Sequence, residues 1–223
     1  QIPFSPVRQT SRTFARSVDW STLRVGPCLN RDRIGPFAGA DRDWTTVPLQ
    51  ELIRYLSVDE HSWFRAELSR IDQKLRQLVH RLGADLNAIS HLPHVFSQFC
   101  RDLQTHMHHE ETELFPAITR HMTAIKAGQP LKGSPLNAFG GPLRVMDHEH
   151  ETTGTALRLF REFGQNYAAP GDASPEYREV MALLSRLEDS LLHHIYLENN
   201  VLYPQAAALK VSRTTGPNPG PAE

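Results

Sequence analysis

Apolar residues recur at helical spacing along four long segments between residues 46 and 208. Capping residues, glycines and prolines at the ends of these segments predict where the helices start and stop. The expected helices run from Pro48 to about Leu82, from near Pro93 to about Lys126, from Pro142 to a stop at Pro170-Gly171, and from an N-cap at Ser174 onward. Long helices with shorter connections pack most simply side by side. We therefore expect an all-α fold, an up-down-up-down four-helix bundle over residues 46–208.

The two ends of the chain differ from this region in composition. Residues 1–45 contain seven arginines and two tryptophans but no histidine. We interpret them as an N-terminal segment that forms a cap or a small accessory domain, with docking of a partner as the alternative. Residues 209–223 are rich in proline and glycine and poor in apolar residues, so we expect a disordered tail.

Charge and cysteine content exclude several classes of protein. The net charge of −1 gives no reason to expect nucleic acid as a partner. No apolar run approaches the roughly 18 residues that would span a bilayer, so no membrane partner is expected. The two cysteines, Cys28 and Cys100, fit neither a disulfide framework nor the spacing of a zinc site. A reducing compartment follows, and we predict a cytoplasmic protein.

A pattern of potential metal ligands occurs twice in the chain. His106 and Glu110 stand four residues apart, and His194 and Glu198 repeat this spacing 88 residues later. On a helix, residues four apart lie on one face, so each pair presents an imidazole and a carboxylate together. A further histidine precedes each pair at nearly the same interval, 45 residues for His61 and 44 for His150. Four histidines and two glutamates therefore repeat as a set.

Imidazole and carboxylate donors without a thiolate disfavour structural zinc and suit iron or manganese. Six protein ligands would saturate one octahedral ion. Two glutamates that bridge a pair of ions would instead give each ion two imidazoles and leave room for a small molecule. The leading hypothesis is thus a di-iron centre whose two ions share an oxo or hydroxo bridge, and manganese would accept the same ligands.

Several residues beside the six are candidates for supporting roles. Asp102 and Glu149 adjoin the ligand histidines and are expected either to orient imidazoles or to face solvent. Four more histidines are neighbours in sequence that we expect to point mostly elsewhere on their helices: His108, His109, His148 and His193. Pro116 and Pro204 each lie six residues beyond a glutamate, where we expect a kink or a helix end.

Four segments of the chain resemble the hemerythrin-like cation-binding family, and more closely its di-iron iron–sulfur cluster repair proteins and nitric oxide response proteins. These segments run from Asp43-Trp44 to His61, from His106 to Pro116, from Gly141-Pro142 to Glu151, and from His194 to Pro204. The resemblance implies a non-haem di-iron centre with the four histidines as terminal ligands and Glu110 and Glu198 as bridges. Oxygen-carrying members use a fifth histidine that has no clear counterpart here.

The resemblance implies a function in the response to nitric oxide or oxidative stress. We expect a metal-binding protein, rather than a turnover enzyme, that supplies iron to damaged iron–sulfur proteins or binds nitric oxide or dioxygen. Iron would leave through protonation or a carboxylate shift at Glu110 or Glu198. The alternatives are a non-enzymatic sensor or reservoir for these gases, and a nitric oxide reductase or oxidase. Repair proteins of the family usually carry adjacent cysteines near the N-terminus, whereas residues 1–45 contain only Cys28.

Overall fold

The computed structural model describes residues 42–82, 88–129 and 135–209. Secondary structure within these ranges is entirely helical. The first long helix consists of α2 (Leu49–Arg54), the π turn η4 (Tyr55–Glu60) and α3 (His61–Leu82), and the second of α4 (Leu92–His109), the π turn η6 (Glu110–Leu114) and α5 (Phe115–Lys126). The third is α6 (Pro135–Phe163), and the fourth consists of α7 (Pro175–Leu197), the π turn η8 (Glu198–Leu202) and α8 (Tyr203–Ala208). Short 3-10 helices lie at η3 (Trp44–Thr46), η5 (Ala88–His91) and η7 (Gln165–Tyr167).

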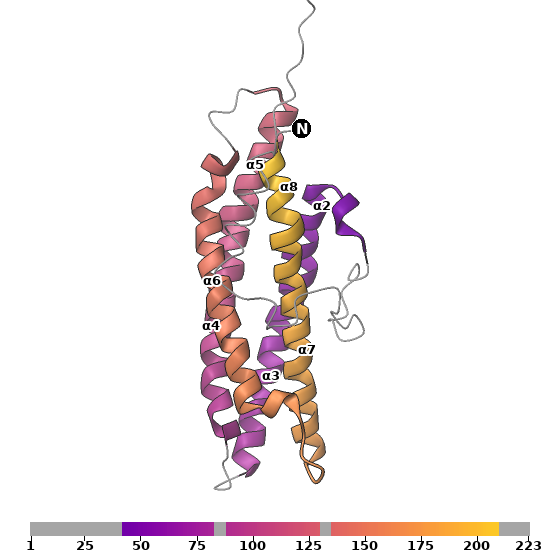
Figure 1. The fold of residues 1–223 in the computed structure, drawn as a ribbon, viewed down its shortest axis with the longest axis vertical. Helices are drawn as coiled ribbons and strands as arrows, with labels where there is room; N and C mark the ends of the chain where they lie inside the picture. Colours follow the sequence, from indigo (N-terminus) through magenta and orange to yellow (C-terminus); the bar gives the residue numbers. More distant parts are fainter. Residues whose placement is uncertain (1–41, 83–87, 130–134, 210–223) are drawn as a thin grey trace, which may run out of the picture.

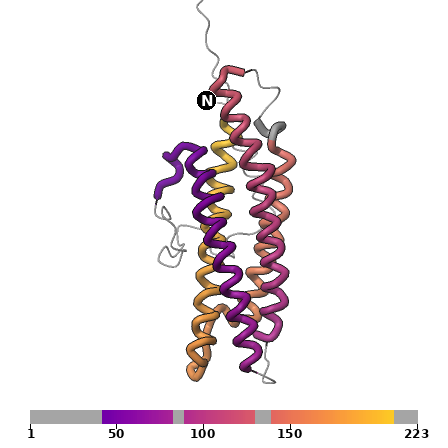
Figure 2. Tube along the Cα trace, turned by 180° about the vertical axis from the view of Figure 1, so that it is seen from behind, coloured from indigo at the N-terminus to yellow at the C-terminus, as the bar shows by residue number. Residues whose placement is uncertain are grey.

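The four long helices stand side by side and alternate in direction (Figures 1 and 2). The chain descends through α2 and α3, rises through α4 and α5, descends through α6 and rises through α7 and α8. Helix α3 packs against α4 and α7, and α6 packs against α4 and α7. This arrangement confirms the predicted all-α four-helix bundle.

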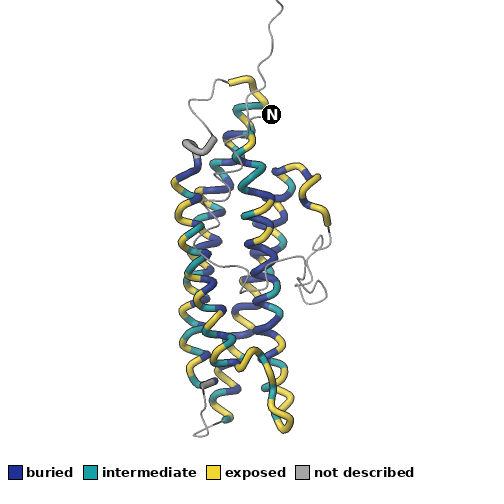
Figure 3. Tube along the Cα trace, viewed as in Figure 1, coloured by how far each residue is buried: buried dark blue, intermediate teal, exposed yellow. Residues whose placement is uncertain are grey.

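Two clusters of buried apolar side chains fill the bundle, one above the other. The first includes Phe64, Leu103 and Met107, and the second includes Leu114 and Phe115. Along the second helix the change from one cluster to the other falls between residues 107 and 114, where the helix carries polar residues instead. Figure 3 shows buried residues on the inward sides of the helices and exposed residues on their outward sides. The interior is therefore apolar at both ends, with a polar layer between.

The third helix begins earlier than the sequence predicted. Helix α6 starts at Pro135 and runs through Gly140, Gly141 and Pro142, which we had expected to precede or open it. Phe139 is fully buried and packs edge-on against His121, with ring centroids 5.9 Å apart. Burial of this ring outweighs the poor helix propensity of the glycines and the missing proline donor.

The same helix also ends earlier than predicted, at Phe163 rather than near Pro170. The amide of Gly164 donates to the carbonyl of Phe160 at 2.8 Å. The next three residues, Gln165 to Tyr167, have positive φ angles of 50°, 55° and 64°. This left-handed backbone cannot continue a right-handed helix, so the turn towards α7 begins here.

The predicted start of the fourth helix is confirmed. The Ser174 side chain accepts a hydrogen bond from the Tyr177 amide at 3.2 Å, and Pro175 and Glu176 occupy the first turn. Replacing Ser174 by alanine removes this cap, and we expect a loss of about 1 kcal/mol in the free energy of unfolding. Urea denaturation measures the change. Ser174→Asp, which retains a capping oxygen, should be close to wild type, and an equal loss in both variants would contradict the capping role.

Most residues of the predicted N-terminal segment and tail lie outside the described residues. Residues 42–45 of the N-terminal segment are described, and Trp44 among them is only 3% exposed. Its ring packs on that of Tyr55 with centroids 4.3 Å apart, so it belongs to the second apolar cluster of the bundle. Within the described ranges, none of the helices combines the length and apolar character that a bilayer crossing requires.

Candidate metal centre

Three of the four long helices widen into a π turn at the level of the polar layer. Turn η4 ends directly before His61, whereas η6 and η8 begin at Glu110 and Glu198. The amide of Phe115 donates to the carbonyl of Glu110, and that of Tyr203 to the carbonyl of Glu198, five residues back in each case. Such turns are frequent at functional sites.

The π turns also replace the kink or helix end that we expected at the two prolines. Pro116 and Pro204 lie in the first turn of α5 and α8, directly after η6 and η8. A proline leaves one carbonyl of the preceding turn without its α-helical donor. The wider turn takes up this defect just before each proline, and the helix continues beyond it (Figure 1).

All six residues of the repeated set meet in the polar layer, and each is at most 2% exposed. The Oε2 atom of Glu110 lies 3.1 Å from Nε2 of His61, 3.4 Å from Nε2 of His106 and 3.6 Å from Nε2 of His194. The carboxylate of Glu198 lies 3.0 Å from Nε2 of His150 and 3.7 Å from Nε2 of His194. One histidine from each long helix therefore points its Nε2 atom at the two glutamates.

These distances suit a metal site. One donor atom from each of His106, Glu110, His194 and Glu198 lies within 4.8 Å of the others. Such a spread is compatible with metal–nitrogen and metal–oxygen bonds of about 2 Å from a common centre.

Buried polar atoms without partners provide a test of whether a cation fits. Among the described residues, the Nε2 atoms of His61 and His194 and all four carboxylate oxygens of Glu110 and Glu198 lack hydrogen-bond partners. An unsatisfied buried polar group costs about 1–3 kcal/mol, and more when it is charged. Burial and the adjacent charge of Glu110 raise the pKa of the Glu198 carboxyl well above its usual value. A cation between these atoms would satisfy them and neutralise the two facing acids, so the donor set fits a metal.

Glu149, one of the two supporting candidates, lies against two imidazoles. Its Oε2 atom is 3.1 Å from Nδ1 of His106, and its Oε1 atom is 2.7 Å from Nδ1 of His109. A carboxylate on Nδ1 fixes the orientation and tautomer of an imidazole and leaves Nε2 as the metal donor. Asp102, the other candidate, accepts a hydrogen bond from the Gln98 side chain at 2.8 Å, and within the described ranges no hydrogen bond joins it to an imidazole.

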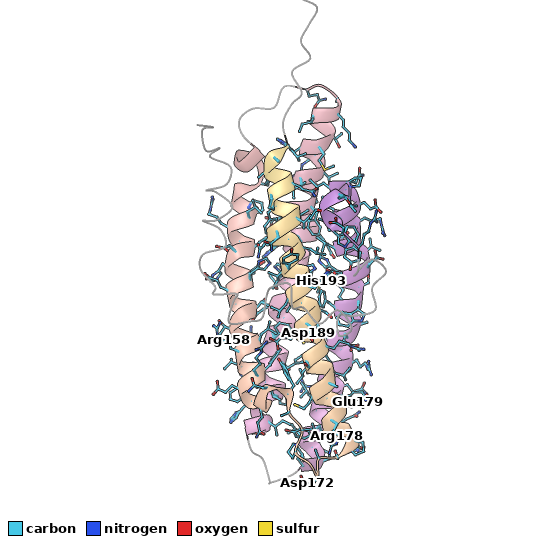
Figure 4. All side chains as sticks on the ribbon, turned by 45° about the vertical axis from the view of Figure 1, so that its right-hand side comes forward. Arg158, Asp172, Arg178, Glu179, Asp189 and His193 are labelled. Atoms are coloured by element: carbon cyan, nitrogen blue, oxygen red, sulfur yellow. The ribbon has the colours of Figure 1, made fainter. Side chains whose placement is uncertain are left out.

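Glu60, which was not expected from the sequence, holds the opposite side of the centre. This fully buried carboxylate lies 2.6 Å from Nδ1 of His194 and 3.2 Å from Nδ1 of His193. Burial tends to raise the pKa of Glu60, but its hydrogen bonds with His193 and His194 lower it to about 2. His193 lies on α7 halfway along the bundle, one turn beyond Asp189 (Figure 4).

The repeat itself contained the signal for Glu60. Glu149 directly precedes His150, and Glu60 directly precedes His61. In the structure each of these glutamates supports the histidine of the neighbouring helix that carries a glutamate four residues later, His106 for Glu149 and His194 for Glu60. The outer carboxylates are therefore repeated along with the inner donors.

A third outer carboxylate, that of Glu111, was likewise not expected from the sequence. Its Oε1 atom lies 2.7 Å from Nδ1 of His61 and accepts a hydrogen bond from Arg65 at the same distance. Arg65 thereby keeps a positive charge beside a carboxylate that is 30% exposed. Of the remaining neighbouring histidines, His108 and His148 are exposed, as expected for solvent-facing positions.

Comparisons with known proteins agree with this site. The profile of the hemerythrin HHE cation-binding domain matches residues 53–206, which include all six inner donors. Proteins named iron-sulfur cluster repair protein YtfE are similar over 169 residues, 75% of this chain and 70% of theirs: the protein of Enterobacter sp. (strain 638) is 32% identical, and those of Citrobacter koseri and Escherichia coli O1:K1 / APEC are each 31% identical. The chain therefore belongs to the hemerythrin HHE cation-binding family.

Proposed function

We propose that the chain holds two iron ions in the polar layer and supplies iron to damaged iron–sulfur clusters. The observation that carries the proposal is the buried convergence of four imidazoles on two carboxylates whose oxygens have no other partner. The similar proteins named for iron–sulfur cluster repair support the biological task. The proposed ligands are His61, His106, Glu110, His150, His194 and Glu198.

The composition of the donor set favours iron over a structural metal. Within the described ranges, the layer offers imidazole nitrogen and carboxylate oxygen and no thiolate, a set that suits iron or manganese. Glu110 approaches histidines of three helices and Glu198 those of two. Carboxylates in such positions can bridge two ions and lower the net charge of the pair.

When bound, iron supplies redox chemistry and a store of metal for transfer. The residues of the chain orient the ligands, keep water away from the centre and allow metal to leave. Glu60, Glu111 and Glu149 hold three of the imidazoles in orientation through Nδ1, and the two apolar clusters exclude water from above and below. Movement of an inner carboxylate away from one ion would lower the number of protein donors and allow metal to leave.

The proposal is tested with iron-loaded full-length protein and an iron–sulfur enzyme inactivated by nitric oxide. We expect recovery of enzyme activity that depends on the loaded centre, and none with Glu110→Ala. Glu113→Ala, an exposed carboxylate in the same π turn, is the matched control and should restore activity as wild type does. If wild-type protein with full iron content restores nothing, cluster repair is not its task.

Binding of nitric oxide or dioxygen is the second candidate, and the apolar surroundings of the centre favour it. Phe64 packs edge-on against His194 at 5.5 Å between ring centroids, and Phe115 stacks on His61 at 6.0 Å. Uncharged diatomic molecules partition into such surroundings, and six protein donors leave two ions with open positions. Tight binding of nitric oxide without cluster repair would favour this role. Steady-state consumption of nitric oxide with a reductant would instead indicate a reductase.

A further inference from the structure

The two halves of the centre differ at one position that the π turns bring next to the glutamates. Five residues after Glu110 the chain has Phe115, and five residues after Glu198 it has Tyr203. Because a π turn closes its hydrogen bond over five residues, each aromatic residue lies one turn above its glutamate. In an α-helix the same residue would point well away from the face of the glutamate. The two halves therefore share the same backbone at this position, but only the half with Glu198 has a hydroxyl there.

The Tyr203 hydroxyl is buried and has no hydrogen-bond partner among the described residues. Burial, followed by the charges of Glu198 and Glu110, raises the pKa of Tyr203 well above its usual value. A phenol is protonated at neutral pH in any case and can donate one hydrogen bond. Buried hydroxyls normally have a partner, and one without it beside a charged acceptor requires an explanation.

Among the neighbouring carboxylates, that of Glu198 acts most strongly on this hydroxyl, and its two oxygens also lack hydrogen-bond partners. Phe115, in the equivalent place, has no donor to offer Glu110 and instead stacks on His61 with an interplanar angle of 21°. A hydrogen bond to a carboxylate oxygen draws electron density from it and weakens it as a metal ligand. The two glutamates would then hold metal unequally.

We propose that Tyr203 is a positioning residue that donates a hydrogen bond to Glu198 and makes Glu198 the weaker bridge, so that metal leaves the centre by opening at Glu198 rather than at Glu110. This inference rests on the proposed di-iron centre and names the side from which it opens. Glu110 remains the firmer ligand, because its neighbour is a hydrocarbon ring. The asymmetry allows one carboxylate to move while the other retains the ions.

The test measures the rate at which a chelator removes ferrous iron from the loaded full-length protein. Loss of one hydrogen bond to a charged group corresponds to roughly a tenfold change, so Tyr203→Phe should release iron about tenfold more slowly than wild type. Phe115→Tyr adds a hydroxyl beside Glu110 and should speed release. The exchange of both residues, Phe115→Tyr with Tyr203→Phe, should restore a rate near that of wild type. Tyr196→Phe, which removes a hydroxyl from a 39% exposed side chain of α7, is the matched control and should change nothing.

Absorption spectra of the loaded proteins give a second readout that a merely structural role would not move. The bands of the bridged iron pair should shift in Tyr203→Phe and remain unchanged in Tyr196→Phe. Unchanged or faster release from Tyr203→Phe at full iron content would overturn the inference. If this variant fails to fold, Phe115→Tyr decides, because release at the wild-type rate would equally overturn it. Cluster repair is not measured in this test, so the inference can fail while the proposed function stands. A wild-type chain that binds no iron would contradict both the inference and the proposed function.

Discussion

Replacement of Glu198 by alanine is expected to abolish metal binding at the centre. The variant loses the carboxylate that lies 3.0 Å from Nε2 of His150 and 3.7 Å from Nε2 of His194, and Glu110 is then the one inner carboxylate left for the centre. Loss of an outer partner of a metal ligand already costs about 10–100-fold in affinity, so loss of an inner donor should cost more than about 100-fold. Metal analysis and the absorption spectrum of purified protein measure the result, and Glu110→Ala should behave in the same way.

The control for this experiment is Glu113→Ala, which should retain the metal content and spectrum of wild type. Wild-type protein with two irons per chain and oxo-bridged bands would support the proposed centre. One zinc per chain, or iron content that survives both Glu110→Ala and Glu198→Ala, would contradict it. Metal content is measured on folded protein, so each variant is first compared with wild type by circular dichroism.

The second large effect is expected from Glu60, a residue outside the inner donor set. Glu60→Gln keeps the shape of the side chain but removes the charge that holds His193 and His194. The imidazole of His194 then loses its fixed tautomer and part of its basicity, and metal affinity should fall by about 10–100-fold. Competition with a chelator of known affinity measures the change.

The repeat supplies a matched comparison for Glu60. Glu149→Gln alters the equivalent contact with His106 and should weaken metal binding to a similar extent. Glu51→Gln, which alters a partly exposed carboxylate of α2 that pairs with Arg42, should leave the affinity unchanged. Equal affinities of Glu60→Gln and wild-type protein would mean that the outer carboxylate has no influence on the metal.

Much of the candidate site could be predicted because the two His/Glu pairs have the spacing of a regular α-helix. Each glutamate is the first residue of its π turn, and its amide still donates to the carbonyl of the histidine four residues earlier. The spacing from His106 to Glu110, and from His194 to Glu198, is therefore α-helical and places both residues of a pair on one face. The equal intervals to His61 and His150 then indicated the complete set. Whether these residues bind metal stays a prediction, but the structure places all six together.

Contacts between helices were harder to predict than positions along one helix. Glu60 contacts an imidazole 134 residues away in sequence, and Glu111 one that is 50 residues away. A single sequence does not show that such distant residues lie close together in space. The position of Glu60 could still have been inferred by carrying Glu149 across the repeat. Glu111 has Asn199 as its equivalent, so the repeat offered no such help there.

Local signals failed where tertiary packing opposed them. The string Gly140-Gly141-Pro142 is a strong helix-breaking signal, yet α6 passes through it because Phe139 is buried in the second apolar cluster. The π turns were also missed, since one additional residue shifts the apolar spacing only slightly. For η6 and η8 the signal in the sequence was the proline six residues after each glutamate, where we had expected a kink or a helix end.

The π turns η6 and η8 also bear on the history of the chain. Each has one residue more than the α-helical turn that it replaces, and each begins at the glutamate of its half. An insertion is a discrete event, and two at equivalent sites 88 residues apart are most simply explained as one event that was later copied. Phe115 and Tyr203, which stand directly after these turns, show that the two halves need not be identical in side chain where they are alike in backbone.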